Sequence, residues 1–251
     1  MIYVVRHGER GDDAIDPTEK EKMIAEYDPH LTKLGFLQAQ AAGKEILRFT
    51  DDFTAKANLK TKDLKYIVVS SPFLRCIQTA ANIVNSIGLD KIYNGKIYLE
   101  SGASEIMSKK WFKETINEDL LIKKLNKEEL TTMIGAEYTW GLGPEKVIVQ
   151  PQYPEDFQQF CDRFETFYNA VKDWFLETFP SEEYALIIVT HGYGVQCVVE
   201  LNTEFDLTKG TDFTCISGFY YPDAKATREK PITFVQQHAE HITKVKITES
   251  K

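Results

Sequence analysis

An alternation of apolar runs with longer amphipathic segments constrains the fold of this 251-residue chain more than any other feature. Four apolar runs have the length of β-strands, at residues 2–5, 66–70, 92–99 and 184–190. Segments of helical length lie among them, at residues 32–49, 72–87 and 154–179. Apolar strands that alternate with helices typically form a parallel sheet covered on both faces. The sequence therefore predicts an α/β protein with three layers, α/β/α, around a mainly parallel central sheet.

Two regions depart from that alternation. Residues 212–221 and 231–237 are both β-like and follow one another without an obvious helix, which predicts an antiparallel edge. Residues 101–153 mix charged helical pieces with Gly and Pro, which predicts an inserted rim segment over one end of the sheet. Because no repeat, low-complexity tract or linker divides the chain, we expect residues 1–251 to form a single domain.

The segment 154–179 carries a stripe of large apolar residues at helical spacing. An aromatic stripe at this spacing is typical of a helix face that packs into a core. We therefore interpret the whole stripe as core and not as a ligand site. Its members are Phe157, Phe160, Cys161, Phe164, Phe167, Tyr168, Val171, Trp174 and Phe175.

Charge and composition argue against several classes of protein. The formal net charge of −8 disfavours nucleic acid as a partner, because such binding depends on many contacts from Lys and Arg to phosphate. No apolar stretch approaches the roughly 18 to 20 residues of a membrane span, and the first residues lack the pattern of a secretory signal. We expect a cytoplasmic or nuclear protein that binds no membrane. The four cysteines have no metal-binding spacing and are predicted to be free thiols.

Polar clusters follow three of the predicted strands directly. They are "RHGER" at residues 6–10, "SSPFLRCIQTA" at residues 70–80 and "THGYG" at residues 190–194. In an open α/β sheet, ligands bind beyond the carboxyl ends of the strands. We therefore expect the three clusters to converge on one site.

The converging residues carry an unusual amount of positive charge. Two His-Gly pairs, at His7 and His191, would meet Arg6, Arg10 and Arg75 in one crevice. Taken singly, each of these residues has an ordinary structural explanation. Together they indicate a phosphoryl site, because the guanidinium group donates paired hydrogen bonds that match phosphate oxygens.

These motifs resemble those of the histidine phosphatase superfamily, branch 1, whose fold is also called phosphoglycerate mutase-like. The resemblance rests on "RHGER", "LTKLGFLQAQ" at residues 31–40, "SPFLRCIQTA" and the late "THG", and it extends to about residue 196. Within the superfamily, the motifs are most similar to the phosphatase domain of the suppressor of T-cell receptor signalling proteins, which also contain ubiquitin-associated and SH3 domains.

The resemblance implies a role for each residue of the cluster. His7 would be the nucleophile that forms a phosphohistidine, and Arg6, Arg10, Arg75 and His191 would bind the phosphoryl oxygens. A neutral imidazole is a competent nucleophile near neutral pH, and arginines can neutralise the phosphoryl charge. We therefore expect a metal-independent reaction with no cofactor. We also expect His191 to act as a charged or hydrogen-bond-donating partner.

The reaction also needs a general acid that protonates the leaving oxygen. The resemblance implies a carboxylate in "YLESGASEIM", residues 98–107, which contains Glu100 and Glu105. Aligning Glu100-Ser-Gly with the Glu-Pro-Gly of similar phosphatases favours Glu105, whereas the mutase pattern favours Glu100. We predict that Glu105 is the acid and keep Glu100 as the alternative.

The resemblance favours hydrolysis of a phosphomonoester over mutase chemistry. Superfamily mutases and bisphosphatases have Ser at the position of Arg10, and the acid phosphatase branch has a late His-Asp pair where this chain has His191-Gly192. Two alternatives stay open: a phosphate-binding module with little turnover, and a phosphosugar mutase or bisphosphatase. The substrate is a phosphorylated small molecule or a phosphoprotein, and the sequence does not indicate the oligomeric state.

The insertion contains several aromatic residues with two alternative interpretations. They are either a surface that stacks on an aromatic leaving group or the small core of the insertion itself. They are Trp111, Phe112, Tyr138 and Trp140.

Overall fold

Seven strands form one sheet in the part of the chain that the computed structural model describes, in the order β4-β3-β2-β5-β1-β6-β7. Their bounds are Ile2–Arg6 (β1), Lys65–Ser70 (β2), Ile92–Leu99 (β3), Tyr138–Trp140 (β4), Tyr184–Thr190 (β5), Ile216–Tyr220 (β6) and Ile232–Val235 (β7). The structure describes residues 1–14, 16–21, 27–56, 59, 63–112, 128, 131–132, 136–142, 149–181, 183–205, 210–221, 231–235 and 239. The strands from β4 to β1 are parallel, and β6 and β7 form an antiparallel edge.

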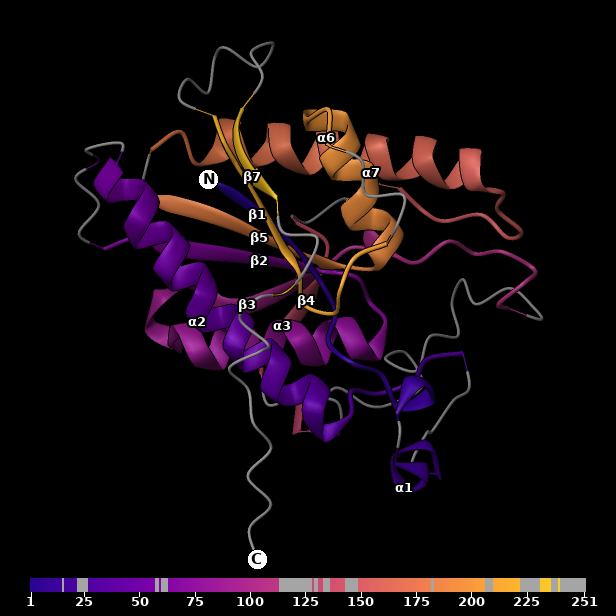
Figure 1. Cartoon of the computed structure of the whole chain (residues 1–251). Helices are drawn as coiled ribbons and strands as arrows, with labels where there is room; N and C mark the ends of the chain where they lie inside the picture. Colours follow the sequence, from indigo (N-terminus) through magenta and orange to yellow (C-terminus); the bar gives the residue numbers. More distant parts are fainter. Residues whose placement is uncertain are drawn as a thin grey trace, which may run out of the picture.

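Helices cover both faces of the sheet (Figure 1). Helices α2 (Lys33–Lys56) and α3 (Leu74–Ile87) lie on one face, and α6 (Phe157–Thr178) and α7 (Gly192–Asn202) lie on the other. The side chains of β1 divide accordingly: Tyr3 and Val5 pack into one core, while Ile2 and Val4 pack into the other. The predicted three-layer fold with a mainly parallel sheet is confirmed. Short elements complete the described chain, namely α1 (Pro17–Glu21), η1 (Gly11–Asp13), η2 (Leu89–Lys91) and η3 (Ser101–Ala103).

Side-chain hydrogen bonds fix where two helices begin. At α6, the Asp156 carboxylate accepts from the Gln159 N–H, and the Gln159 side chain accepts from the Asp156 N–H, which is a capping box. At α3, the cap comes from a distant segment, because the Leu74 N–H donates to Asp28 Oδ1 at 2.8 Å. The segment around Asp28 is thereby attached to the helix that carries Arg75.

The aromatic stripe of α6 is only partly core. Phe160, Phe164, Phe167 and Phe175 are buried, whereas Phe157 is 49% exposed. Phe157 is the first residue of α6 and lies against Tyr193 of α7, with ring centroids 5.5 Å apart. The prediction that the whole stripe is core is therefore wrong at this end.

The predicted insertion contributes to the sheet as well as to its rim. Its residues 138–140 form β4, which pairs in parallel with β3 through Ile97 to Leu99. Phe112 and Tyr138 are buried in the core on the α2–α3 face, and Trp140 packs against it. Trp111 is exposed instead. Most of the charged helical pieces predicted within residues 101–153 lie outside the described residues.

None of the helices in the described part of the chain has both the length and the apolar character needed to cross a membrane. All four cysteines are free thiols. Cys161 of α6 and Cys197 of α7 lie side by side, with their Sγ atoms 3.6 Å apart.

Candidate active site

Strand register brings the three polar clusters to the same level of the sheet. Arg6 of β1 pairs with Thr190 of β5, and Ser70 of β2 pairs with Val189 of β5. One residue further on, the His7 N–H donates to the Thr190 carbonyl at 2.9 Å. His7 and His191 therefore leave two adjacent parallel strands at the same carboxyl edge, as the sequence predicts.

Two glycines let the loop after β1 approach the start of α2. A Cβ added at Gly8 would lie 2.6 Å from the Gly35 carbonyl oxygen, and one at Gly35 would lie 2.2 Å from the Glu9 carbonyl oxygen. Both distances are far below van der Waals contact with backbone atoms that cannot move aside. The motifs "RHGER" and "LTKLG" are thus held together by a backbone contact that only glycine allows.

The two histidine rings are buried and meet edge to face. Their centroids are 5.4 Å apart, with an interplanar angle of 68°. His7 Nδ1 lies 2.8 Å from the Gly8 carbonyl oxygen, which can only accept, so Nδ1 carries the proton. The lone pair of His7 is therefore on Nε2, where the Arg75 Nε–H donates to it at 3.3 Å.

Arg75 connects the two imidazoles. Its Nη2–H donates to His191 Nδ1 at 3.1 Å, which leaves the His191 proton on Nε2, 2.9 Å from Ser71 Oγ. Burial, followed by the nearby Arg75 charge, lowers the pKa of both histidines well below the usual value. The neutral imidazole expected of His7 is therefore present. The charge expected of His191 is not, because burial and Arg75 both oppose it.

Arg75 is completely buried beside a buried carboxyl group. Its Nη1 lies 3.7 Å from Asp28 Oδ1, which is too far for a hydrogen bond. Burial raises the pKa of Asp28 to about 7, against the opposing effect of the Arg75 charge. Arg75 Nη1 consequently has no hydrogen-bond acceptor, although it is buried. Such an unpaired donor is costly unless a ligand supplies the acceptor.

The other two arginines differ in their pairing. The Arg6 Nη1–H donates to the Thr211 carbonyl, and its guanidinium lies 4.3 Å from the centre of the Phe213 ring. Its Nε is buried without an acceptor. Arg10 instead forms ion pairs with Asp12 at 2.8 Å and Asp13 at 3.1 Å. A phosphoryl group would therefore have to compete with these two carboxylates for Arg10.

Glu105 and Glu100 lie in different environments. Glu105 is 6% exposed, and its Oε2 lies 3.6 Å from His191 Nδ1. Burial raises the pKa of this carboxyl, which favours its protonated form. Glu100 is also buried, but its Oε1 accepts from the Leu142 N–H at 3.1 Å, and it is not among the residues that line the site cavity.

Arg163 of α6 holds the loop that carries Glu105. It donates to the carbonyls of Gly102 at 2.7 Å and Glu105 at 3.2 Å, and it forms a buried ion pair with Glu155 at 2.5 Å. Sequence reasoning missed this residue. A signal was present, because Arg163 is a charged residue on the otherwise apolar face of the aromatic stripe.

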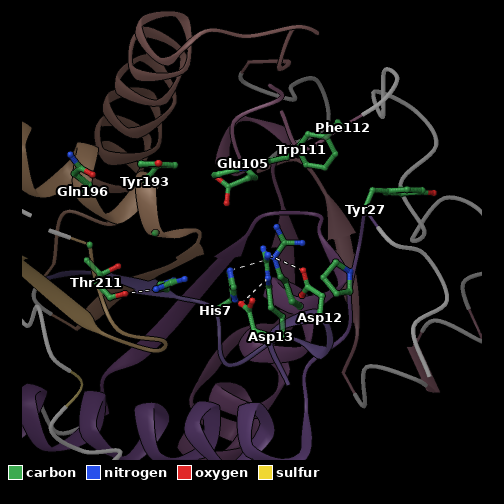
Figure 2. Close-up of a pocket in the computed structure, with 16 residues that line it drawn as sticks. His7, Asp12, Asp13, Tyr27, Glu105, Trp111, Phe112, Tyr193, Gln196 and Thr211 are labelled. Atoms are coloured by element: carbon green, nitrogen blue, oxygen red, sulfur yellow. Dashed lines mark hydrogen bonds and ion pairs between the residues drawn. The ribbon is translucent and has the colours of Figure 1, made fainter. Parts of the chain in front are cut away.

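The site opens into a cavity of about 590 Å³. His7, Arg6, Arg10, Arg75 and Glu105 all line it, and His191 lies directly behind this lining. Figure 2 shows Glu105 pointing toward His7 from the opposite wall. The sequence did not single out several other lining residues, including Asp12, Asp13, Tyr193, Gln196 and Thr211. No cluster of three or more His, Cys, Asp or Glu side chains suited to a metal ion occurs among the residues that the structure describes.

A buried imidazole with its lone pair among guanidinium groups, at the edge of a parallel sheet, is an arrangement suited to binding a phosphoryl group. The family model of the histidine phosphatase superfamily, branch 1, matches residues 2–225. The chain belongs to this superfamily.

Solved structures with the same fold are distant in sequence. Ecdysone phosphate phosphatase from Bombix mori, in complex with tungstate, is 17% identical to this chain. The match covers 88% of each chain and has a TM-score of 0.56. Alpha-ribazole phosphatase from Shigella flexneri is 16% identical over 95% of this chain and 96% of its own, with a TM-score of 0.51. Phosphoglycerate mutase from Bacillus anthracis is 14% identical over 97% of this chain and 95% of its own, with a TM-score of 0.50. No curated protein sequence matches the chain significantly.

Proposed function

We propose that the chain is a metal-independent phosphomonoester hydrolase that acts through a phosphohistidine on His7. One observation carries the proposal: the lone pair of His7 Nε2 lies among guanidinium groups, and Arg6 and Arg75 each have one buried N–H donor with no acceptor. A phosphoryl group bound there would supply the missing acceptors and offer its phosphorus to Nε2. Arg6, Arg75 and, after release from its carboxylates, Arg10 would hold the phosphoryl oxygens.

The reaction has two steps on these residues. His7 Nε2 attacks phosphorus as the bond from phosphorus to the ester oxygen breaks, and Glu105 gives its proton to the departing alcohol. A water molecule then attacks the phosphohistidine, Glu105 takes back a proton, and phosphate leaves with His7 restored. The dianionic phosphoryl group favours a second proton on His191, at Nδ1, from which it could donate to a phosphoryl oxygen, whereas in the free enzyme the single His191 proton lies on Nε2 and faces Ser71.

The more specific assignments are part of the same proposal. We place the chain near the phosphatase domain of the suppressor of T-cell receptor signalling proteins, on the strength of "RHGER" and "SPFLRCIQTA". Hydrolysis is favoured over mutase chemistry because Arg10 stands where superfamily mutases have Ser. We also propose that residues 1–251 act as one catalytic domain, since a single sheet carries all the site residues, and that the protein works in the cytoplasm or nucleus without a cofactor.

The direct test is hydrolysis of p-nitrophenyl phosphate in excess EDTA, combined with acid-free quenching to trap a phosphoenzyme. We expect turnover to persist with the chelator and a phosphoenzyme that is stable to base but labile to acid. The label should map to His7 by peptide mass spectrometry. Tight phosphate binding without turnover would instead support the binding-module alternative, and transfer of phosphate to a second alcohol in place of water would support a mutase.

The pH dependence of kcat/KM follows from the shifted pKa values of His7 and Glu105. The lowered pKa of His7 keeps the nucleophile neutral to more acidic pH than usual, and the raised pKa of Glu105 keeps the acid protonated to higher pH than usual. We expect the rate to rise through the first ionisation, peak between mildly acidic and neutral pH, and fall through the second. A plateau that continues above about pH 9 would contradict a required protonated acid.

A further inference from the structure

The position of Glu105 identifies the side of the cavity from which the alcohol leaves. Because a general acid protonates the leaving oxygen, the leaving group must lie beside this carboxyl group. This step rests on the proposed function. Figure 2 shows Tyr193, Glu105 and Trp111 on the same side of the cavity, opposite His7. Both aromatic residues line the cavity.

Exposed aromatic rings gather at this part of the cavity rim. Trp111 is 43% exposed and Tyr193 is 37% exposed. Their rings are nearly parallel, with an interplanar angle of 17° and centroids 5.8 Å apart. Phe157, the exposed end of the α6 stripe, supports the Tyr193 ring edge-on. Exposed aromatic surface gains free energy when a flat apolar ligand covers it, so the cluster points to a ligand.

The described lining residues offer no cation to a second anionic group on the leaving side. Among the described lining residues the cations are Arg6, Arg10 and Arg75, which surround the phosphoryl position. Asp12 and Asp13 line the same cavity and already neutralise Arg10. Among the lining residues that the structure describes, no cation is left for a carboxylate or a second phosphate. The cavity of about 590 Å³ is nevertheless much larger than a phosphoryl group needs, given about 30 Å³ for one water molecule.

We infer that the leaving group is an uncharged, flat apolar ring system that binds against Trp111 and Tyr193. The substrate class is thus a monophosphate ester of an aryl or similarly flat ring alcohol, and not a phosphosugar or a bisphosphate. Trp111 and Tyr193 determine this specificity without touching the transferred phosphoryl group.

The test compares kcat/KM of each variant with that of wild type on the same substrate. The intrinsic difference in reactivity between the two leaving groups then cancels. We expect Trp111→Ala and Tyr193→Ala each to lower kcat/KM for 2-naphthyl phosphate by about 10-fold, and for glycerol 3-phosphate by less than about 2-fold. Trp111→Phe should retain most of the activity on the naphthyl ester. The matched control is Leu89→Ala, since Leu89 is 58% exposed but lies in η2, before β3, at the far end of the sheet.

Equal losses on both substrates, or a wild-type preference for glycerol 3-phosphate, would overturn the inference and leave the proposed hydrolase intact. A binding measurement distinguishes failure of the site formed by Trp111 and Tyr193, here called the ring site, from failure of the proposed function. The non-hydrolysable 2-naphthylmethylphosphonate should bind wild type about 10-fold more tightly than ethylphosphonate does, and Trp111→Ala should remove this difference. If no ester is hydrolysed and this binding difference is still found, the proposed function fails while the ring site stands. If the difference is absent, the ring site fails.

Discussion

His7→Ala is expected to lower kcat for p-nitrophenyl phosphate by about 10⁴-fold or more, because the variant has no atom that can form the covalent intermediate. The phosphoenzyme should disappear with it. Phosphate binding should survive, since Arg6 at the end of β1 and Arg75 on α3 keep their unpaired donors. The measurements are steady-state turnover, phosphoenzyme trapping and isothermal titration with orthovanadate.

The matched control for this prediction is His30→Ala. His30 is a second histidine of the N-terminal region that does not line the cavity, and its substitution should leave kcat within about 3-fold of wild type, because it removes no group that faces the site. If His7→Ala hydrolysed the ester at the wild-type rate while still binding vanadate, His7 would not be the nucleophile.

Glu105→Gln is expected to have the second largest effect, and its size should depend on the leaving group. Glutamine keeps the shape of the side chain and removes the transferable proton. We expect kcat to fall about 10²- to 10³-fold for an alkyl phosphate, whose alkoxide leaves poorly without protonation, and less than about 10-fold for p-nitrophenyl phosphate. The slope of log kcat against leaving-group pKa should therefore become steeper in the variant.

Glu100→Gln separates the two candidate acids. Its carboxylate binds the Leu142 N–H, and glutamine can replace that contact through its own carbonyl oxygen. We expect the slope to match wild type in this variant, even if its stability changes. A steeper slope in Glu100→Gln but not in Glu105→Gln would exchange the roles of the two residues.

Much of the fold could be predicted because its core elements satisfy local rules. The strands β1, β2 and β5 are apolar on both faces, β3 has apolar residues at its two ends, and α3 and α6 have clear helical periodicity, so pattern alone identifies them. β4 could not be predicted, because its three residues become a strand only through pairing with β3. The exposure of Phe157 was also missed, because periodicity assigns a face to a helix but does not say where the covering layer ends.

The candidate site could be predicted to a similar extent. His7, Arg75 and His191 were found because each follows a strand end, and parallel strands bring their carboxyl ends together. The ion pairs of Arg10 with Asp12 and Asp13 span only two and three residues, but they depend on the turn of η1 that brings these side chains together. The stacking of Tyr193 on Trp111 joins segments far apart in the chain, which spacing along a chain does not encode.

The pairing of β1 with β5 has a consequence for how this chain tolerates insertions and deletions. Side chains alternate between the faces of a strand, so a shift of one residue in β1 would move His7 away from the level of Thr190 and turn Arg6 to the other face. The core residues of β1 would exchange faces too, and Tyr3 would lose its buried hydrogen bond with Thr50. A one-residue length change within β1 would therefore damage catalysis and folding together, and natural length variation should be confined to the loops between the strands.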